Sequence, residues 1–384
     1  MSHKNSMNMH SNPFLISGYQ SEELFCNREH ETSLLINNTL NGNNMTLISP
    51  RRMGKTGLIL HAFKKLSTNK QCETLYVDIF ATRSLSEFIK ALSEAMLNEF
   101  NEKTSLGKKF WNFVKGLRPL ITYDPLSGVP QVQINYQTEG EKQQTLRHLL
   151  RLLENHNKRI IVAIDEFQQI REYPEDNIEA LLRTEIQHMQ NVSFIFCGSK
   201  RHMMIDIFSN NKKPFYASTQ FLFLKEIETK DYAPFIKKLF EENGRKIEQE
   251  TIEFILKWTK NYTFYTQSVC NKIYASQTKK ITVETVKNAI QEILELQTPV
   301  YHQLRDLLTT AQWNYLIAIA KEDRITQITA QDFLMKHQIG TASNSTRLMK
   351  SLVDKELILE TILRDKKEYA IYDVFFSHWL KNNY

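Results

Sequence analysis

The sequence has few cysteines and no apolar run long enough to cross a membrane. The four cysteines, Cys26, Cys72, Cys197 and Cys270, are far apart in a chain of 384 residues and form no CxxC pair. Such spacing favours separate buried thiols over disulfides or zinc ligands. The longest apolar runs, such as residues 160–164, are far shorter than the ~18–20 residues of a spanning helix. We therefore expect no membrane helix, disulfide framework or thiolate metal site.

The sequence also lacks a histidine metal motif, a signal peptide and a strong charge bias. Its 11 histidines are scattered and include no HExxH pattern. Residues 1–14 are polar, without the apolar segment of a secretory signal, so a cytoplasmic location is expected. A net charge of +6 permits contact with nucleic acid or an acidic partner but requires neither. The 41% hydrophobic and 24% charged residues are typical of a globular protein, and the length suggests two or three domains.

Short apolar segments alternate with helix-length segments over the first 224 residues. Strands are predicted at 45–48, 75–79, 160–164 and 192–196, and helices at 22–40, 57–66, 84–100, 140–157 and 178–188. This alternation predicts a parallel sheet with crossover helices, and the uniformly apolar strands predict burial between two helical layers. Residues 101–138 interrupt this alternation of strands and helices. Alternation at 121–123 and 132–136 around a turn at 124–128 predicts a hairpin insertion there.

The two ends of the chain differ from this α/β region. Residues 1–20 are polar, with an early Asn12-Pro13, and are predicted to form a loose arm. After about residue 224 most segments have helical spacing. Two helical modules, 225–298 and 299–384, fit this part, and Thr298-Pro299 is the expected boundary between them.

The strongest chemical signal is the segment Ser-Pro-Arg-Arg-Met-Gly-Lys-Thr, which ends at Thr56 between a predicted strand and a predicted helix. A phosphate-binding loop needs this context, because backbone N–H groups and a helix N-terminus bind the phosphate oxygens. Lys55 is expected to reach the β- and γ-phosphates, and the Thr56 hydroxyl to bind Mg²⁺. Gly54 allows close backbone approach, whereas Ser49 replaces the first glycine of GxxxxGK[ST] and weakens the match. The candidate nucleotide-binding residues are Ser49, Pro50, Arg51, Arg52, Met53, Gly54, Lys55, Thr56 and Gly57. A chance Gly-Lys-Thr at a helix start is the alternative, and solvated loop arginines are the alternative for Arg51 and Arg52.

Two acids follow the apolar strand at 160–164. A buried strand delivers such carboxylates to the carboxyl edge of a sheet, where ligands bind in open α/β folds. Asp165 is expected to hold Mg²⁺, often through water, and Glu166 to orient and deprotonate the attacking water. A solvated acidic turn is the alternative, but the phosphate-binding loop upstream makes the pair specific. Ser199 follows the next apolar strand and is a candidate contact for the γ-phosphate or the water; it is also explained by an ordinary turn.

These residues resemble the AAA+ class of P-loop ATPases, and more narrowly the prokaryotic archaeal-type ATPases that are related to STAND NTPases. Four blocks of the ATPase core carry the likeness: residues 25–29 are similar to F-x-G-R-E near the adenine, 49–56 to G-P-R-R-x-G-K-T (Walker A), 164–168 to I-D-E-[FI]-Q (Walker B), and Gly198-Ser199 to sensor 1. In the helical lid, residues 261–267 are similar to the segment G-x-P-x-Y-x-Q. Near the end of the sequence, residues 372–380 are similar to the closing block Y-x-[ILV]-x-D-P-F-F-x-x-W-L. Departures are Asn27, Asn261, Thr263 and Val374. The likeness implies that Arg28 is a further nucleotide-site residue.

The resemblance implies an α/β fold with three parts. These are a P-loop NTPase core with a parallel sheet at 13–224, including a hairpin insertion near 101–138, a small helical lid at 225–298 and a winged-helix domain at 299–384, preceded by a flexible arm at 1–12. It implies an ATP-binding and ATP-hydrolysing switch with Mg²⁺ as cofactor, in which lid closure moves the winged helix. A DNA-associated ATPase of the initiator or mobile-element type, and a nucleotide-binding scaffold with negligible hydrolysis, remain the alternatives.

Two further features of the sequence indicate which partners to expect. They are the predicted winged helix and a candidate arginine finger. Helices at 310–320, 329–337 and 343–355 with strands at 357–361 and 368–372 fit a winged helix. Arg347, Lys350 and Lys355 offer a modest basic surface, so either DNA or, more readily, a protein is the expected partner. Arg183 is the candidate to act on a neighbour's nucleotide in an oligomer, with pairing to Glu179 or Glu185 as the alternative. The arginine of the family's P-F-Y-G-R block is missing after Tyr216, which predicts slow hydrolysis.

Overall fold

The computed structural model describes residues 12–100, 107–108, 110–111, 120–123, 130–133, 136, 138–363 and 366–384. These residues divide into two compact units. One comprises Gly18–Lys225, and the other joins the described residues up to Ser17 with Glu226–Tyr384. In the part of the chain that the structure describes, no helix has the length and apolar character needed to cross a membrane.

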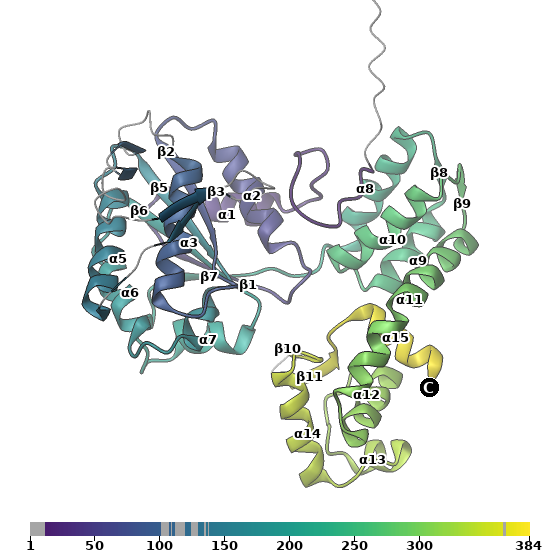
Figure 1. The fold of residues 1–384 in the computed structure, drawn as a ribbon. Helices are drawn as coiled ribbons and strands as arrows, with labels where there is room; N and C mark the ends of the chain where they lie inside the picture. The colour runs from purple at the N-terminus through teal and green to yellow at the C-terminus, as the bar shows by residue number, and fades with distance from the viewer. Residues whose placement is uncertain are drawn as a thin grey trace, which may run out of the picture. The chain divides into compact units, whose positions relative to one another are not determined.

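A five-stranded parallel sheet forms the centre of the first unit (Figure 1). Its strands are β1 (Met45–Ile48), β2 (Cys72–Asp78), β5 (Arg159–Asp165), β6 (Val192–Gly198) and β7 (Gln220–Phe223). They are arranged in the order β2-β5-β6-β1-β7, and every neighbouring pair is parallel. The parallel α/β sheet predicted from the alternating segments is confirmed. The sequence did not predict β7, an edge strand of four residues whose outer positions are largely exposed.

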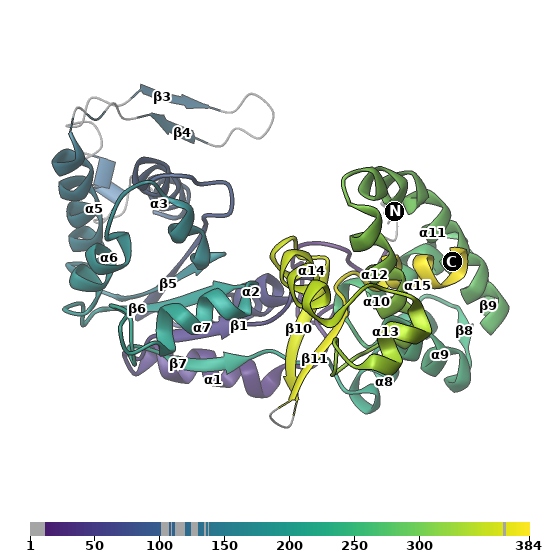
Figure 2. The same cartoon turned by 90° about the horizontal axis from the view of Figure 1, so that it is seen from below.

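Helices cover both faces of this sheet (Figures 1 and 2). One face carries α1 (Glu29–Leu40) and α2 (Lys55–Leu66), and the other carries α3 (Leu85–Glu99), α5 (Glu139–Glu154), α6 (Ile178–Ile186) and α7 (Arg201–Ser209). A short 3₁₀ helix, η1 (Phe167–Glu172), follows β5. Side chains cap two of these helices, because the Ser84 hydroxyl accepts from Glu87 N and that of Thr138 from Glu141 N.

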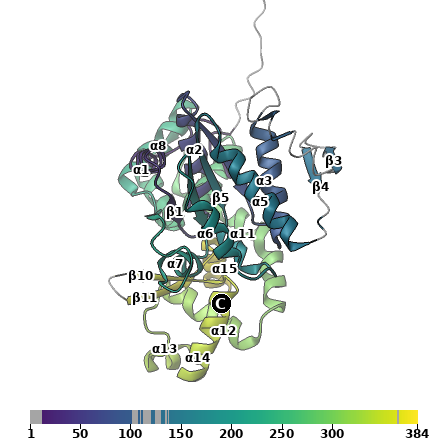
Figure 3. The same cartoon turned by 90° about the vertical axis from the view of Figure 1, so that its left-hand side faces the viewer.

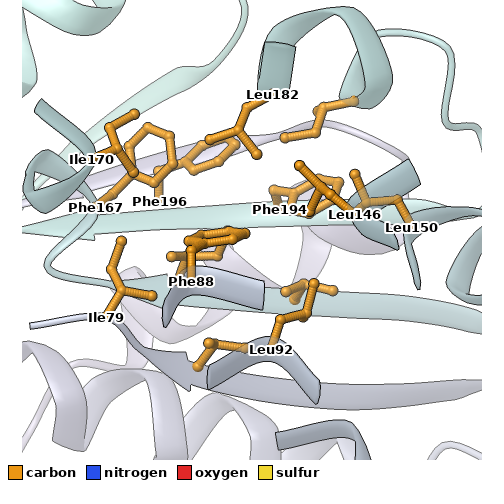
Figure 4. Close-up of a cluster of buried hydrophobic side chains, with 14 of the residues drawn as sticks. Ile79, Phe88, Leu92, Leu146, Leu150, Phe167, Ile170, Leu182, Phe194 and Phe196 are labelled. Carbon is orange, nitrogen blue, oxygen red and sulfur yellow. The ribbon is translucent and has the colours of Figure 1, made fainter. Parts of the chain in front are cut away.

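The main hydrophobic core fills the space between the sheet and the α3, α5, α6 and α7 layer (Figure 4). Phe194 and Phe196 point into it from β6, Phe88 from α3 and Leu146 from α5. All four are at most 2% exposed, and each side chain of this size contributes roughly 1.5–3 kcal/mol on burial. This core therefore fixes β5 and β6, whose carboxyl ends carry the candidate acids.

A separate pair of strands lies outside the sheet, with β4 beside α3 (Figure 3). Strands β3 (Leu120–Tyr123) and β4 (Pro130–Gln133) are antiparallel, and Leu120 pairs with Gln133. This pair lies within the predicted hairpin insertion. The predicted turn at 124–128, and the predicted strand residues 134–135, lie outside the described residues.

The second unit consists mainly of helices. They are α8 (Thr229–Glu242), α9 (Gln249–Thr259), α10 (Thr263–Ala275), α11 (Val283–Asp306), α12 (Thr310–Glu322), α13 (Gln331–His337), α14 (Ala342–Asp354) and α15 (Val374–Asn383). Short strands β8 (Lys246–Ile247) and β9 (Lys280–Ile281) pair in parallel, and β10 (Ile358–Leu363) pairs with the antiparallel β11 (Lys366–Ile371). Ile325 adds a bridge to Tyr369 beside the β10–β11 ladder. Helices α12 to α14 and this ladder form the predicted winged helix.

Helix α11 spans the boundary predicted at Thr298-Pro299, and the two predicted modules share this helix. The helix runs through Pro299 without ending, although an interior proline costs about 3 kcal/mol. Thr298 Oγ1 donates to Leu294 O at 2.8 Å and accepts from Trp379 Nε1 at 2.9 Å. Leu294 and Tyr301, on either side of the proline, are buried. Packing on both sides therefore keeps the helix continuous through the proline.

The segment that begins at Asn12 is also placed differently from the prediction. Residues 12–17 belong to the helical unit, whereas the sequence suggested a loose arm followed by core residues from 13 onward. Phe14 is 1% exposed and packs against Phe240 with ring centroids 4.5 Å apart. Asn271 fixes the backbone, because its Nδ2 donates to Phe14 O at 2.7 Å. One buried aromatic ring thus anchors residues 12–17.

Candidate nucleotide-binding and catalytic site

The loop between β1 and α2 has the backbone shape of a phosphate-binding loop. Gly54, the residue before α2, has φ 88°, and Arg52 has φ 71°. A residue without a side chain tolerates such angles best, which explains Gly54. Ser49 is 2% exposed and its hydroxyl donates to Pro50 O at 3.0 Å. The serine that replaces the pattern's first glycine is therefore accommodated, since the left-handed positions of the loop lie further along.

Lys55 lies folded over this loop. Its Nζ donates to Ser49 O at 3.1 Å and to Pro50 O at 3.2 Å, and the residue is 7% exposed. A phosphate oxygen is a stronger acceptor for an ammonium group than a neutral carbonyl is. The side chain is therefore held where a bound phosphate group would replace its two carbonyl partners.

Thr56 and Asp165 are brought together although they are 109 residues apart. Thr56 Oγ1 donates to Asp165 Oδ2 at 2.8 Å. Two further donors hold this carboxylate: Tyr76 Oη bonds to Oδ2 at 2.7 Å, and Glu166 N bonds to Oδ1 at 2.9 Å. Burial, and then the charge of Asp165, raises the pKa of Tyr76 far above its usual range. The phenol therefore stays protonated and acts as a donor at neutral pH.

The end of β5 also orients Glu166. This residue has φ 55° and precedes η1, so its side chain leaves the strand direction. Ser199 Oγ donates to Glu166 Oε2 at 2.7 Å, and Gln168 Nε2 donates to the same oxygen at 2.5 Å. Gly198 leaves room for this arrangement, since a Cβ there would lie 2.4 Å from Gln168 Oε1. Sequence alone did not select Gln168 or Tyr76 as site residues.

The donor set of this site fits Mg²⁺. The ion prefers hard oxygen ligands and is commonly bound by one or two carboxylates together with phosphate oxygens and water. Thr56 and Asp165 supply a hydroxyl and a carboxylate oxygen within 2.8 Å of each other. Asp78 pairs with Asp165 across the β2–β5 ladder. Burial, followed by the charges of Asp165 and Glu166, raises the pKa of Asp78. A divalent cation would relieve this concentration of negative charge.

Family comparisons agree with this geometry. Residues 25–263 match the family described as "ATPase domain predominantly from Archaea", and this match spans more than half of the chain. The chain belongs to this ATPase family. Residues 299–382 match the "Probable winged helix domain" family. No curated protein matches the chain. The recognition of an archaeal-type P-loop ATPase with a winged helix is confirmed.

Solved structures with the same fold include a Walker-type ATPase and two ORC proteins. The Walker-type ATPase of Pyrococcus abyssi has 18% identity and a TM-score of 0.65, with 96% of this chain and 99% of that chain covered. The Aeropyrum pernix ORC2 protein, solved as ADPNP–ADP complexes, has 14% identity and a TM-score of 0.59, with 97% and 96% covered. The Aeropyrum pernix ORC1 protein in complex with DNA has 13% identity and a TM-score of 0.52, with 94% and 93% covered. At these identities the likeness shows the fold alone.

The other arginine candidates of this ATPase lie outside the cluster formed by Lys55, Thr56 and the two acids. Arg28 is 5% exposed and donates to Glu31 Oε1 at 2.8 Å and to Lys225 O at 2.5 Å. It therefore connects the start of α1 with the last residue of the first unit. Arg51 lies over the Phe80 ring, with 5.3 Å from its guanidinium carbon to the centroid.

Arg183, the candidate finger residue, is half-buried on α6. The two glutamates considered as its partners bond to other arginines. Glu179 Oε1 accepts from Arg171 at 3.0 Å, and Glu185 Oε1 accepts from Arg147 at 2.8 Å. The alternative that Arg183 pairs with Glu179 or Glu185 is therefore not supported, because each glutamate pairs with another arginine.

Proposed function

We propose that this protein is an ATP-binding and ATP-hydrolysing switch whose nucleotide state is transmitted to its winged helix. One observation carries the proposal: the 2.8 Å hydrogen bond from Thr56 to Asp165. It places the end of a phosphate-binding loop beside an acid at the carboxyl edge of the sheet. Lys55 precedes Thr56 in the sequence and Glu166 follows Asp165. Both therefore lie next to this hydrogen bond. This arrangement supports phosphoryl transfer to water.

The proposed chemistry assigns one task to each side chain. Lys55 would leave its carbonyl partners and stabilise charge on the β- and γ-phosphates. Thr56 and Asp165 would hold Mg²⁺, which when bound neutralises charge on the phosphate oxygens. Glu166 would orient the attacking water and accept its proton, and Ser199 would keep the Glu166 carboxylate in place. Backbone N–H groups of the loop and the start of α2 would bind phosphate oxygens.

Contacts within the second unit support coupling between the proposed lid, residues 225–298, and the winged helix. The rings of Trp258 on α9 and His378 on α15 stack at 4.1 Å, and His378 Nε2 donates to Trp258 O at 3.0 Å. Asp323 accepts from Lys260 at 3.4 Å and from Lys381 at 2.6 Å. Helix α11 continues from one segment into the other. A lid that moves when nucleotide binds would therefore carry the winged helix with it.

The turn after Phe215 supports slow hydrolysis. Relatives place a glycine and an arginine after the tyrosine of the P-F-Y-G-R block, and this chain has Ala217 and Ser218. Ala217 keeps the left-handed backbone, with φ 52°, at a cost of about 1–2 kcal/mol. The Ser218 hydroxyl donates to Phe215 O at 2.6 Å and offers no cationic group. Arg183 of a neighbouring copy remains the candidate for that charge.

The proposal is tested by ATP binding and turnover with Mg²⁺ in the wild type, Lys55→Ala and Glu166→Gln. We expect Lys55→Ala to lose binding, and Glu166→Gln to bind ATP but hydrolyse it at least about tenfold more slowly. Equal ATP binding by all three proteins would contradict the phosphate-loop assignment. Binding without turnover in both the wild type and Glu166→Gln would instead identify a nucleotide-sensing scaffold.

A DNA-associated ATPase is the second candidate. The solved ORC1 protein, which shares the fold, is in complex with DNA, and α14 of the winged helix carries exposed Arg347 and Lys350. The affinity for DNA phosphates falls as the salt concentration rises. In a plot of log affinity against log salt concentration, each lost phosphate contact makes the slope shallower by about 0.9. Arg347→Ala with Lys350→Ala should then lower the slope for duplex DNA by about 2. Retention that is absent or independent of salt would exclude this function and leave a protein partner.

A further inference from the structure

A tyrosine of β2 bonds directly to the acid at the end of the neighbouring strand. Tyr76 Oη donates to Asp165 Oδ2 at 2.7 Å, and the same oxygen accepts from Thr56 Oγ1 at 2.8 Å. The contact joins two different strands, so it depends on the register of the sheet. Tyr76 is opposite Ala163 in the ladder, two residues before the position opposite Asp165. The phenol therefore reaches along the sheet toward its carboxyl edge.

Several hydrogen-bond donors together orient the Asp165 carboxylate, and the Cys197 thiol is one of them. Glu166 N bonds to Oδ1 at 2.9 Å, while Thr56 and Tyr76 share Oδ2. The residue is 5% exposed, so little water is available to replace a lost donor. The Thr56 hydroxyl has a second task in the proposed mechanism, because its oxygen binds the cation. Of the two hydroxyl donors to Asp165, Tyr76 is the one whose bond is not shared with that task.

The chemistry of a phenol suits this position. A lysine or arginine at the same place would hold the carboxylate equally well, but its positive charge would oppose the entry of a divalent cation. A phenol donates one hydrogen bond and leaves the negative charge of Asp165 in place. Tyr76 can therefore orient the carboxylate without lowering its attraction for a metal ion.

We propose that Tyr76 is a positioning residue for Mg²⁺: it holds the Asp165 carboxylate beside the Thr56 hydroxyl, and these two residues would hold the cation. The proposal rests on the function proposed above, since it assumes that Asp165 and Thr56 serve a nucleotide-bound Mg²⁺. It predicts that Tyr76 contributes to the metal-dependent part of nucleotide binding. The metal-independent part, which depends on Lys55 and the loop backbone, needs no contribution from it.

The test compares wild type with Tyr76→Phe, which removes one oxygen atom. A fluorescent ATP analogue is bound first in EDTA and then during a titration with MgCl₂, without measuring turnover. In EDTA the affinities should agree within about twofold. The Mg²⁺ concentration for the half-maximal increase should rise on the order of tenfold in the variant, because a hydrogen bond to a charged group is lost.

Tyr173→Phe is the matched control. Its hydroxyl bonds to Thr82 Oγ1 at 2.5 Å, so the variant also loses one buried phenol bond in the same unit. It should keep the wild-type Mg²⁺ dependence, and thermal unfolding of each variant verifies the fold. An unchanged or tighter Mg²⁺ response in Tyr76→Phe, alongside a Mg²⁺-responsive wild type, overturns the inference alone. A wild type whose ATP binding ignores Mg²⁺ overturns the proposed function as well.

Discussion

Ser199 Oγ donates a 2.7 Å hydrogen bond to Glu166 Oε2 and so connects the ends of two neighbouring strands. Ser199 follows β6 and Glu166 follows β5, and these strands pair in parallel. Ser199 is buried, and Gln168 donates to the same Glu166 oxygen from η1. The carboxylate proposed to activate water is therefore held from two sides by uncharged donors, which orient it.

Ser199→Ala should slow ATP turnover about tenfold and leave ATP affinity within about twofold, because it removes one bond to a charged group away from the phosphate loop. Steady-state turnover and equilibrium binding measure the two effects separately. Ser193→Ala is the matched control, since Ser193 is also buried on β6 but donates to Thr39 O at 2.7 Å. A large loss of ATP affinity in Ser199→Ala would instead indicate direct contact with the γ-phosphate.

Gly198→Ala should both destabilise the first unit and reduce turnover. The added Cβ would lie 2.4 Å from Gln168 Oε1 and 2.5 Å from Met204 Sδ, so Gln168 must move away from Glu166. We expect a loss of about 1–3 kcal/mol in unfolding free energy and slower hydrolysis, measured by denaturant unfolding and by turnover. Gly140→Ala on α5, where the nearest atom is 3.8 Å away, should change neither quantity appreciably. Wild-type turnover in Gly198→Ala would show that the Gln168 contact is dispensable.

The sequence predicts most of the first unit because local patterns and burial agree there. The run of five apolar residues before Asp165 predicts a strand that is buried on both faces, and the structure places it inside the sheet between β2 and β6. Strand β7 could not be predicted in this way. Its residues Gln220–Phe223 are few and half-exposed, and the strand depends on pairing with β1. Pro299 lies inside α11 for a related reason, because tertiary packing of Tyr301 overrides the local preference of proline.

The candidate site was partly predictable for similar reasons. Lys55, Thr56 and the two acids belong to contiguous motifs, so spacing alone selects them. Tyr76 enters the site through the register of two strands that are distant in sequence, and its only local signal is its place two residues before Asp78. Arg28 is recognised in a family block, but its bonds to Glu31 and Lys225 depend on how the chain returns to α1. No local pattern reports such contacts.

Phe14→Ala should destabilise the helical unit by about 3–5 kcal/mol, the usual cost of removing a fully buried phenylalanine. The ring is 1% exposed and lies against Phe240 and Tyr274, so its loss leaves a cavity and releases residues 12–17. Calorimetric unfolding of the full chain measures the effect. Ile16→Ala, at 47% exposure in the same segment, should change the free energy by less than about 1 kcal/mol. Equal effects of both substitutions would show that the segment is not anchored through Phe14.

His378 should make the stability of the helical unit depend on pH. Burial, with the positive charges of Lys260 and Lys381 acting in the same direction, lowers the pKa of His378 to about 4. The hydrogen bond to Trp258 O and the charge of Asp323 act in the opposite direction. The unfolded chain has a histidine pKa of about 6.5. Between these values the unfolded state binds the additional proton, so stability is lost as the pH falls from about 6.5 toward 4. At pH 5 the loss amounts to about 2 kcal/mol relative to pH 7.5.

His378→Gln separates this contribution from that of the carboxylates. Glutamine has no charge to gain and can still donate to the Trp258 carbonyl that His378 Nε2 contacts at 3.0 Å. Unfolding free energies of both proteins are measured at pH 7.5 and pH 5. Acidification should destabilise the wild type by about 2 kcal/mol more than the variant, because only the wild type must protonate an imidazole on unfolding. The same pH dependence in both proteins would mean that the folded unit does not lower the pKa of His378, and would contradict the prediction.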